Sequence, residues 1–150
     1  ISYLFNTLTG FSMPRYWNKI SVAPNDLRTK LYELIDNEME NQKSGKKSKI
    51  IMKANSLTDK AMIEKLYDAS RAGVEIKLII RGACSLKVGI KDISENIEVF
   101  SIVGRYLEHS RIYYFEKLEV VLQPLFLLVL IQLDLQNTSF FQQFILRLLF

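Results

Sequence analysis

A strand–helix–strand pattern over residues 50–80 constrains the fold more than any other feature of the chain. The apolar run 50–54 predicts a strand, and residues 74–80 predict a second one that alternates at first and is fully apolar at its end. Between them, apolar residues at helical spacing predict a helix that is capped by Thr58 and stops at Gly73. A strand, a crossover helix and a strand over about 30 residues require parallel strands and a right-handed crossover. The sequence therefore predicts an α/β domain.

Polar side chains follow both predicted strands at their carboxyl ends. Lys53 and Asn55 close the first strand, and Arg81 follows the second. Parallel strands finish at the same edge of a sheet, and open α/β sheets bind ligands outside that edge. We therefore expect a cation, an amide and an always-charged guanidinium to meet there, which suits an anion such as phosphate. Gly82 would let a phosphate or another backbone segment approach closely.

The only histidine of the chain, His109, lies two residues before Arg111, and aromatic and β-branched residues follow it. If the predicted strand begins at or before His109, the period of two puts His109 and Arg111 on one face. An imidazole that can carry a proton or a phosphoryl group would then lie beside a guanidinium that can hold phosphate oxygens. A lone histidine is more often structural than catalytic, so this pattern does not decide a function by itself.

The remaining segments are less regular. Residues 1–23 read as a connecting segment, and a helix is predicted from Pro24 and Asn25 to Gly45. The lysine-rich run 43–49 reads as a solvated loop, with a phosphate cradle as the alternative. A further strand is predicted over residues 97–103, before a turn at Gly104.

Charge and cysteine content favour a polyanion partner and a reducing compartment. The chain carries 20 Lys and Arg against 16 Asp and Glu, a modest basic excess that fits a polyanion without proving one. Cys84 is the single cysteine, so an internal disulfide is impossible and a cytoplasmic location is expected. The chain shows no signal-peptide pattern and starts at Ile1, so we expect it to begin inside a longer protein.

Several blocks of the sequence resemble bacterial-type polyphosphate kinases, within the last catalytic domain of that family. The blocks occur in the family's order between about Phe5 and Phe115, and they comprise residues 53–59, 66–74, 78–82 and 101–111. The resemblance implies a phospholipase D-like α/β domain, with a mixed sheet flanked by helices and incomplete at both ends. It assigns residues 24–117 to this partial domain.

The resemblance also implies an activity. Family members transfer the terminal phosphate of ATP reversibly to polyphosphate, through a phosphohistidine in the preceding domain and thus outside this chain. It implies that Arg81 contacts the ATP phosphates and that His109 is the second active-site histidine, active in phosphate contact and proton transfer. Lys53, Asn55 and Arg111 complete the expected phosphate-binding set. Little or no kinase activity is expected of the 150 residues alone.

Other partners follow from the same resemblance. We expect ATP or ADP, polyphosphate and the rest of the kinase chain, in a homo-oligomer, with no specific nucleic acid. Mg²⁺ is expected from the family, but the sequence shows no clear metal site and the ligands would lie upstream. The chain departs from the family at Ala54, at residues 83–85 and at residues 87–89, and these departures are expected to soften the loop after Gly82.

Residues 118–150 change abruptly in character and contain no Gly, Lys or His. We interpret them as an aberrant apolar tail produced by a shifted reading frame. A membrane segment over residues 120–133 is an alternative that leaves membrane association open, although it is shorter than the roughly 20 residues of a span. The tail could also pair with the sheet as strands or as a helix.

Two other functions remain open. The chain could be a non-catalytic polyanion-binding module that uses the run Lys43–Lys49. It could also be a phospholipase D-like phosphodiesterase, which would need a matching His-x-Lys half upstream.

Overall fold

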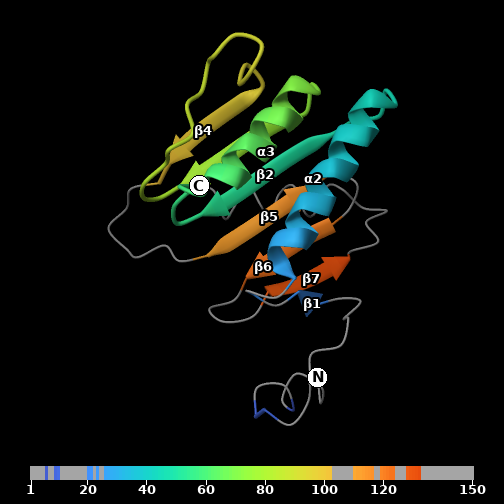
Figure 1. Cartoon of the computed structure of the whole chain (residues 1–150), viewed down its shortest axis with the longest axis vertical. Coiled ribbons are helices and arrows are strands. Elements are labelled where there is room, and N and C mark those ends of the chain that lie inside the picture. Colours follow the sequence, from blue (N-terminus) through green and yellow to red (C-terminus); the bar gives the residue numbers. More distant parts are fainter. Residues whose placement is uncertain are drawn as a thin grey trace.

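The computed structural model describes residues 6, 9–10, 20–21, 23, 26–102, 110–116, 119–123 and 128–132. Among these residues, the strands form one sheet in the order β1-β7-β6-β5-β2-β3-β4 (Figure 1). The elements are β1 (Ile20–Ser21), α2 (Leu27–Lys43), β2 (Lys49–Ala54), α3 (Lys60–Arg71), β3 (Glu75–Ile80), β4 (Ile97–Ser101), β5 (Arg111–Phe115), β6 (Glu119–Gln123) and β7 (Leu128–Gln132).

The predicted strand–helix–strand unit is β2, α3 and β3. These two strands pair in parallel over their whole length, from Lys49 opposite Glu75 to Ala54 opposite Ile80. Strand β4 continues the parallel arrangement on β3, whereas β5 pairs antiparallel with β2. The expected α/β class with a mixed sheet and flanking helices is therefore confirmed. Both helices lie over the same face of the sheet, which Figure 1 shows in front.

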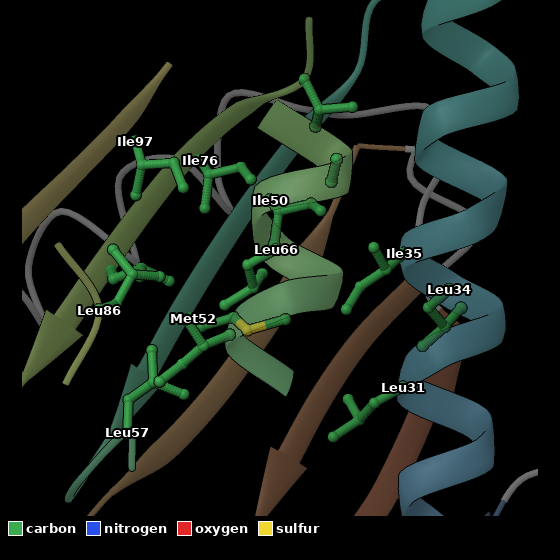
Figure 2. Close-up of a cluster of buried hydrophobic side chains, with 14 of the residues drawn as sticks. Leu31, Leu34, Ile35, Ile50, Met52, Leu57, Leu66, Ile76, Leu86 and Ile97 are labelled. Carbon is green, nitrogen blue, oxygen red and sulfur yellow. The ribbon is translucent and has the colours of Figure 1, made fainter. Parts of the chain in front are cut away.

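The main core lies between that face and the two helices. Helix α2 contributes Leu34 and Ile35, α3 contributes Leu66, and the strands contribute residues such as Ile50 and Ile76 (Figure 2). Each side chain of this size contributes about 1.5–3 kcal/mol when it leaves water. This cluster fixes the two helices on the sheet and thereby sets where the strand ends lie.

The opposite face of the sheet, called the outer face below, carries a different set of side chains. Successive strand residues alternate between faces, so Lys53, Ile79 and Ile112 lie together there in three paired strands. Ile79 and Ile112 are buried but do not belong to the main core cluster. Further along this face, Lys49 and Lys77 form ion pairs with Glu75.

The helix boundaries differ in detail from the prediction. Helix α2 begins at Leu27, with Asp26 as its N-cap residue, rather than at Pro24. The prediction that Thr58 caps α3 is wrong, because the carboxylate of Asp59 accepts the hydrogen bond of the Met62 N–H at 2.8 Å.

The predicted glycine stop of α3 is confirmed. Gly73 has a φ of +94°, a conformation that favours glycine. Within the run 43–49, residues 44–47 are exposed, as expected of a solvated loop. The ends of the run differ from the expectation, because Lys43 ends α2, Ser48 is buried and Lys49 begins β2.

The outer segments hold strands that the sequence left undecided. Ile20–Ser21 pairs with β7, although residues 1–23 were expected to be irregular. Strands β6 and β7 fall within residues 118–150 and extend the sheet beyond β5. The strand predicted over residues 97–103 ends at Ser101, and Gly104 lies outside the described residues. The reading-frame origin of the tail stays a prediction. In the part of the chain that the structure describes, no helix could cross a membrane.

Candidate functional site

The carboxyl ends of β2 and β3 bring their polar neighbours to one edge of the sheet. Ala54 and Ile80 are the last paired residues, and Asn55 and Arg81 follow them directly. The backbone N–H of Arg81 donates to the carbonyl of Ala54 at 3.3 Å, and that of Gly82 donates to the carbonyl of Asn55 at 2.7 Å. The convergence expected from parallel strands is therefore found for these two residues, and both are half-buried.

The loop after Gly82 is held to the same edge by backbone hydrogen bonds. The N–H of Leu57 donates to the carbonyl of Ala83, and the N–H of Ser85 donates to the carbonyl of Leu57, both at 2.9 Å. A Cβ at Gly82 would lie 3.0 Å from the Asn55 carbonyl oxygen. Glycine thus permits the close backbone approach that the sequence predicted. The expected softening of this loop stays a prediction.

The chain returns to this edge through Ser110 and Arg111, where β5 begins. The expected shared face of His109 and Arg111 required a strand that begins at or before His109. Strand β5 begins at Arg111, so the shared face stays a prediction. The pairing of β2 with β5 ends at Lys53 opposite Ile112, whereas on the β3 side the backbone contacts continue past Ala54 to the Gly82 loop. His109 itself lies outside the described residues.

Lys53 is buried at this edge, with 4% of its surface exposed. Its ammonium nitrogen Nζ donates to the hydroxyl oxygen Oγ of Ser110 at 2.7 Å. Lys53 was expected to contact phosphate, and the contact found for it is this hydroxyl. Sequence reasoning gave Ser110 no role, because its partner lies 57 residues away in the chain.

Arg111 lies on the other side of the sheet from Lys53. It alternates with Ile112, which is paired with Lys53, and it shares the helix-covered face with Tyr113, the partner of Met52. Burial raises the pKa of the Tyr113 phenol, and the positive charge of Arg111 nearby opposes that rise. The expected phosphate-binding set is thus divided between two faces of one edge.

A cavity of about 420 Å³ opens on the helix-covered side of the same edge. Its walls come from the ends of β2 and β3, from β5 and from the first turns of α2 and α3. The residues that line it are Ala23, Leu27, Arg28, Leu31, Met52, Ala54, Ser56, Leu57, Thr58, Asp59, Met62, Leu78, Ile80 and Tyr113. The lining is largely apolar, with a few hydroxyl groups and one ion pair.

That ion pair joins the starts of the two helices. Two nitrogens of the Arg28 guanidinium donate to the two carboxylate oxygens of Asp59, at 3.0 and 2.7 Å. The hydrogen bonds from Arg28 and then the Met62 N–H lower the pKa of Asp59. Sequence reasoning missed Arg28, and no local signal marks it.

The described residues do not fit a divalent cation. Among them, no three His, Cys, Asp or Glu side chains converge. Asp59, the acid that lines the cavity, uses both of its carboxylate oxygens on Arg28. The expectation that Mg²⁺ ligands lie elsewhere stays a prediction.

Comparison with known proteins gives a consistent family. The family model described as polyphosphate kinase C-terminal domain 2 matches residues 20–121. The polyphosphate kinase of Staphylococcus haemolyticus is 60% identical over 111 residues, which are 74% of this chain and 15% of that protein. The polyphosphate kinase of Lactiplantibacillus plantarum is 54% identical over 114 residues, covering 76% of this chain and 16% of the relative. The chain thus matches about one sixth of the length of these curated relatives.

Solved structures agree. A polyphosphate kinase from Porphyromonas gingivalis superposes with a TM-score of 0.79 at 36% identity, covering 96% of this chain and 25% of that one. NucT from Helicobacter pylori superposes with a TM-score of 0.54 at 11% identity, covering 87% of this chain and 93% of that one. The second likeness concerns the fold alone.

Proposed function

Because the chain belongs to the polyphosphate kinase family and carries its C-terminal domain 2, we propose that it forms part of the phosphate-handling site of such an enzyme. The proposed reaction moves the terminal phosphoryl group of ATP reversibly to polyphosphate. The bond between the γ-phosphorus and the β–γ bridging oxygen breaks, and ADP leaves. A histidine outside this chain takes the phosphoryl group and passes it to the terminal oxygen of the polyphosphate chain.

One observation carries the proposal for this chain. Arg81 and Asn55 lie at the edge where two parallel strands end, and Gly82 links their backbones. Ser110, which follows His109 in the sequence, lies at the same edge. Phosphoryl transfer depends mainly on positioning and on neutralising the charge of the phosphate oxygens, which is what guanidinium and amide groups at such an edge can do.

The residues have distinct proposed roles. The Arg81 guanidinium binds two phosphate oxygens of the nucleotide, and Asn55 donates a further hydrogen bond. His109 contacts the phosphate and transfers a proton. Arg111 adds a second guanidinium from the other face. No step is assigned to Mg²⁺, since its ligands would lie outside this chain. The chain alone is expected to make no polyphosphate, because it lacks the histidine that is phosphorylated.

The test uses a full-length enzyme. Residues 20–121 of this chain would replace the matching segment of the Staphylococcus haemolyticus polyphosphate kinase, to which it is 60% identical. ATP-dependent polyphosphate synthesis would then be measured for Arg81→Gln and His109→Ala. Loss of one charge-assisted contact should lower kcat/KM for ATP about 10- to 100-fold. Arg71→Gln is the matched control, because this exposed arginine of α3 pairs only locally, with Asp68. Unchanged synthesis in both site variants would overturn the proposal.

A second candidate function rests on the exposed loop after α2. Lys46 and Lys47 are exposed, whereas Lys49 is engaged with Glu75 at 2.9 Å. A polyanion-binding module would therefore use the first two lysines. If Lys46→Ala with Lys47→Ala abolished polyphosphate binding while His109→Ala left synthesis intact, this second function would replace the first.

A further inference from the structure

Lys53 is a cation in an apolar setting on the outer face of the sheet. It pairs with Ile79 on one side and Ile112 on the other, and these two neighbours are 6% and 9% exposed. An ammonium group removed from water must direct its N–H donors at polar atoms, because an unmet donor there is costly. The Lys53 amine meets this need in part on Ser110.

The hydrogen bond between Lys53 and Ser110 also restricts the position of Ser110. Ser110 accepts a hydrogen bond from the ammonium through Oγ, so its side-chain oxygen is held toward Lys53 and its own hydroxyl hydrogen points elsewhere. Ser110 lies just outside the strand, beyond the last pair of β2 with β5, which is Lys53 with Ile112. The side-chain hydrogen bond therefore continues the link between these two chain segments where the backbone pairing stops.

Ser110 is also the residue between His109 and Arg111. The hydrogen bond to Lys53 holds Ser110 toward the outer face directly before Arg111, at the point where the chain enters β5. We propose that Lys53 is a positioning residue, which acts through Ser110 to set how the chain enters β5 and thereby where Ser110 and Arg111 lie at the site. This inference rests on the proposed function, because that function assigns phosphate binding to Arg111.

Two other roles of Lys53 make different predictions. If Lys53 bound a substrate phosphate directly, its loss would weaken ATP binding and Ser110 would be irrelevant. If Lys53 only supported the fold, replacing another lysine of the outer face should lower activity by a similar factor. Methionine suits Lys53 as a replacement, because it is unbranched and apolar and the neighbours are isoleucines. Lys53→Met should therefore fold.

The kinetic test uses the full-length chimera that carries residues 20–121. Lys53→Met, Ser110→Ala and their combination would be compared with Lys77→Met, a control lysine on the same face that is ion-paired with Glu75 and Glu98. We expect either single change to lower kcat about 10- to 100-fold with KM for ATP within about twofold. The combination should be no worse than the stronger single change, and Ser110→Thr, which keeps the hydroxyl, should restore activity.

Several results would overturn the inference. A raised KM for ATP in Lys53→Met, with Ser110→Ala silent, would make Lys53 a phosphate ligand. If the losses in kcat of Lys53→Met and Ser110→Ala multiplied in the combined variant, Lys53 would not act through Ser110. An equal loss in Lys77→Met would indicate a general effect on the fold.

A second measurement needs no activity. In the 150-residue chain, amide hydrogen exchange at Arg111 and Ile112 should speed up in Lys53→Met and not in Lys77→Met. Unchanged amide exchange at Arg111 and Ile112 in Lys53→Met would contradict the positioning role, even if the chimera proved inactive. An inactive unmutated chimera with the expected exchange would count against the proposed function instead.

Discussion

Replacing Gly82 by alanine should destabilise the chain, because the new methyl group has no room. Its Cβ would lie 3.0 Å from the carbonyl oxygen of Asn55 and 3.1 Å from the hydroxyl oxygen of Ser56. The Ser56 side chain is exposed and can rotate away. The Asn55 carbonyl cannot move freely, because it accepts the Gly82 N–H at 2.7 Å. The contact with the carbonyl therefore decides the outcome.

The magnitude follows from two opposing effects. Forcing an extra methyl group into a tight contact costs about 1–3 kcal/mol. Alanine also restricts the unfolded chain, which stabilises the folded state by about 0.4–1 kcal/mol. Gly82 has no left-handed φ, so backbone strain adds nothing to the balance. The steric effect is the larger one, and we expect a net loss of about 1–2 kcal/mol, or about 3–6 °C in Tm for a chain of this length.

Urea unfolding followed by circular dichroism would measure this loss. Ser56→Ala serves as the matched control, alone and together with Gly82→Ala. If the Asn55 carbonyl is the obstacle, removing the Ser56 hydroxyl should rescue little of the stability. Recovery of stability by Ser56→Ala would show that the Ser56 hydroxyl, and not the Asn55 carbonyl, is the obstacle. A Gly82→Ala chain as stable as the unmodified one would show that the edge of the sheet has room, and would refute the reasoning.

Three further predictions concern the core and the titrating groups. Leu66→Ala should cost about 3–5 kcal/mol in urea unfolding, because Leu66 is fully buried, whereas Glu64→Ala on the exposed side of α3 should cost under about 0.5 kcal/mol; equal costs would contradict the packing described. Asp59→Asn should lower Tm at pH 7, and because Arg28 and the helix amide lower the Asp59 pKa, this difference should vanish as the pH falls below the ordinary value of 3.8; a difference that persists in acid would exclude an ionic origin. Burial, with the charge of Glu116, raises the pKa of Tyr114 above its ordinary value of 10.0. Tyr114→Phe should therefore remove a late step from the absorbance titration at alkaline pH, and an unchanged titration curve would contradict this burial. The folded state of the unmodified chain should lose stability as the pH rises above about 10, because the unfolded chain releases the Tyr114 proton first.

The sequence predicted the unit β2–α3–β3 because local patterns encode it. Strand residues alternate or run apolar, the helix has a 3.6-residue period, and Gly73 supplies a left-handed stop. Parallel strands must end at one edge, so Asn55 and Arg81 could be placed together without coordinates. The resemblance to polyphosphate kinases rested on the same blocks, and the family match confirms it.

The sequence predictions that failed or stay open concern the ends of elements. Thr58 and Asp59 are adjacent candidates for the N-cap of α3, and Asp59, the residue type with the higher cap preference, takes the position. Arg28, 31 residues before Asp59, also binds this carboxylate. The shared face of His109 and Arg111 stays a prediction, because β5 begins at Arg111 and His109 lies outside the described residues. Sequence periodicity gives the faces of a strand but not the residue at which its pairing with the neighbouring strand ends.

What the sequence determined by itself was the class of fold, the edge at which polar groups gather and the family. What only the tertiary structure decided was the pairing register, which buries the Lys53 amine against Ser110 and sends Arg111 to the opposite face. The physical reason is the range of the forces. Periodicity and capping act over a few residues, whereas register is set by packing and hydrogen bonds between segments more than 50 residues apart.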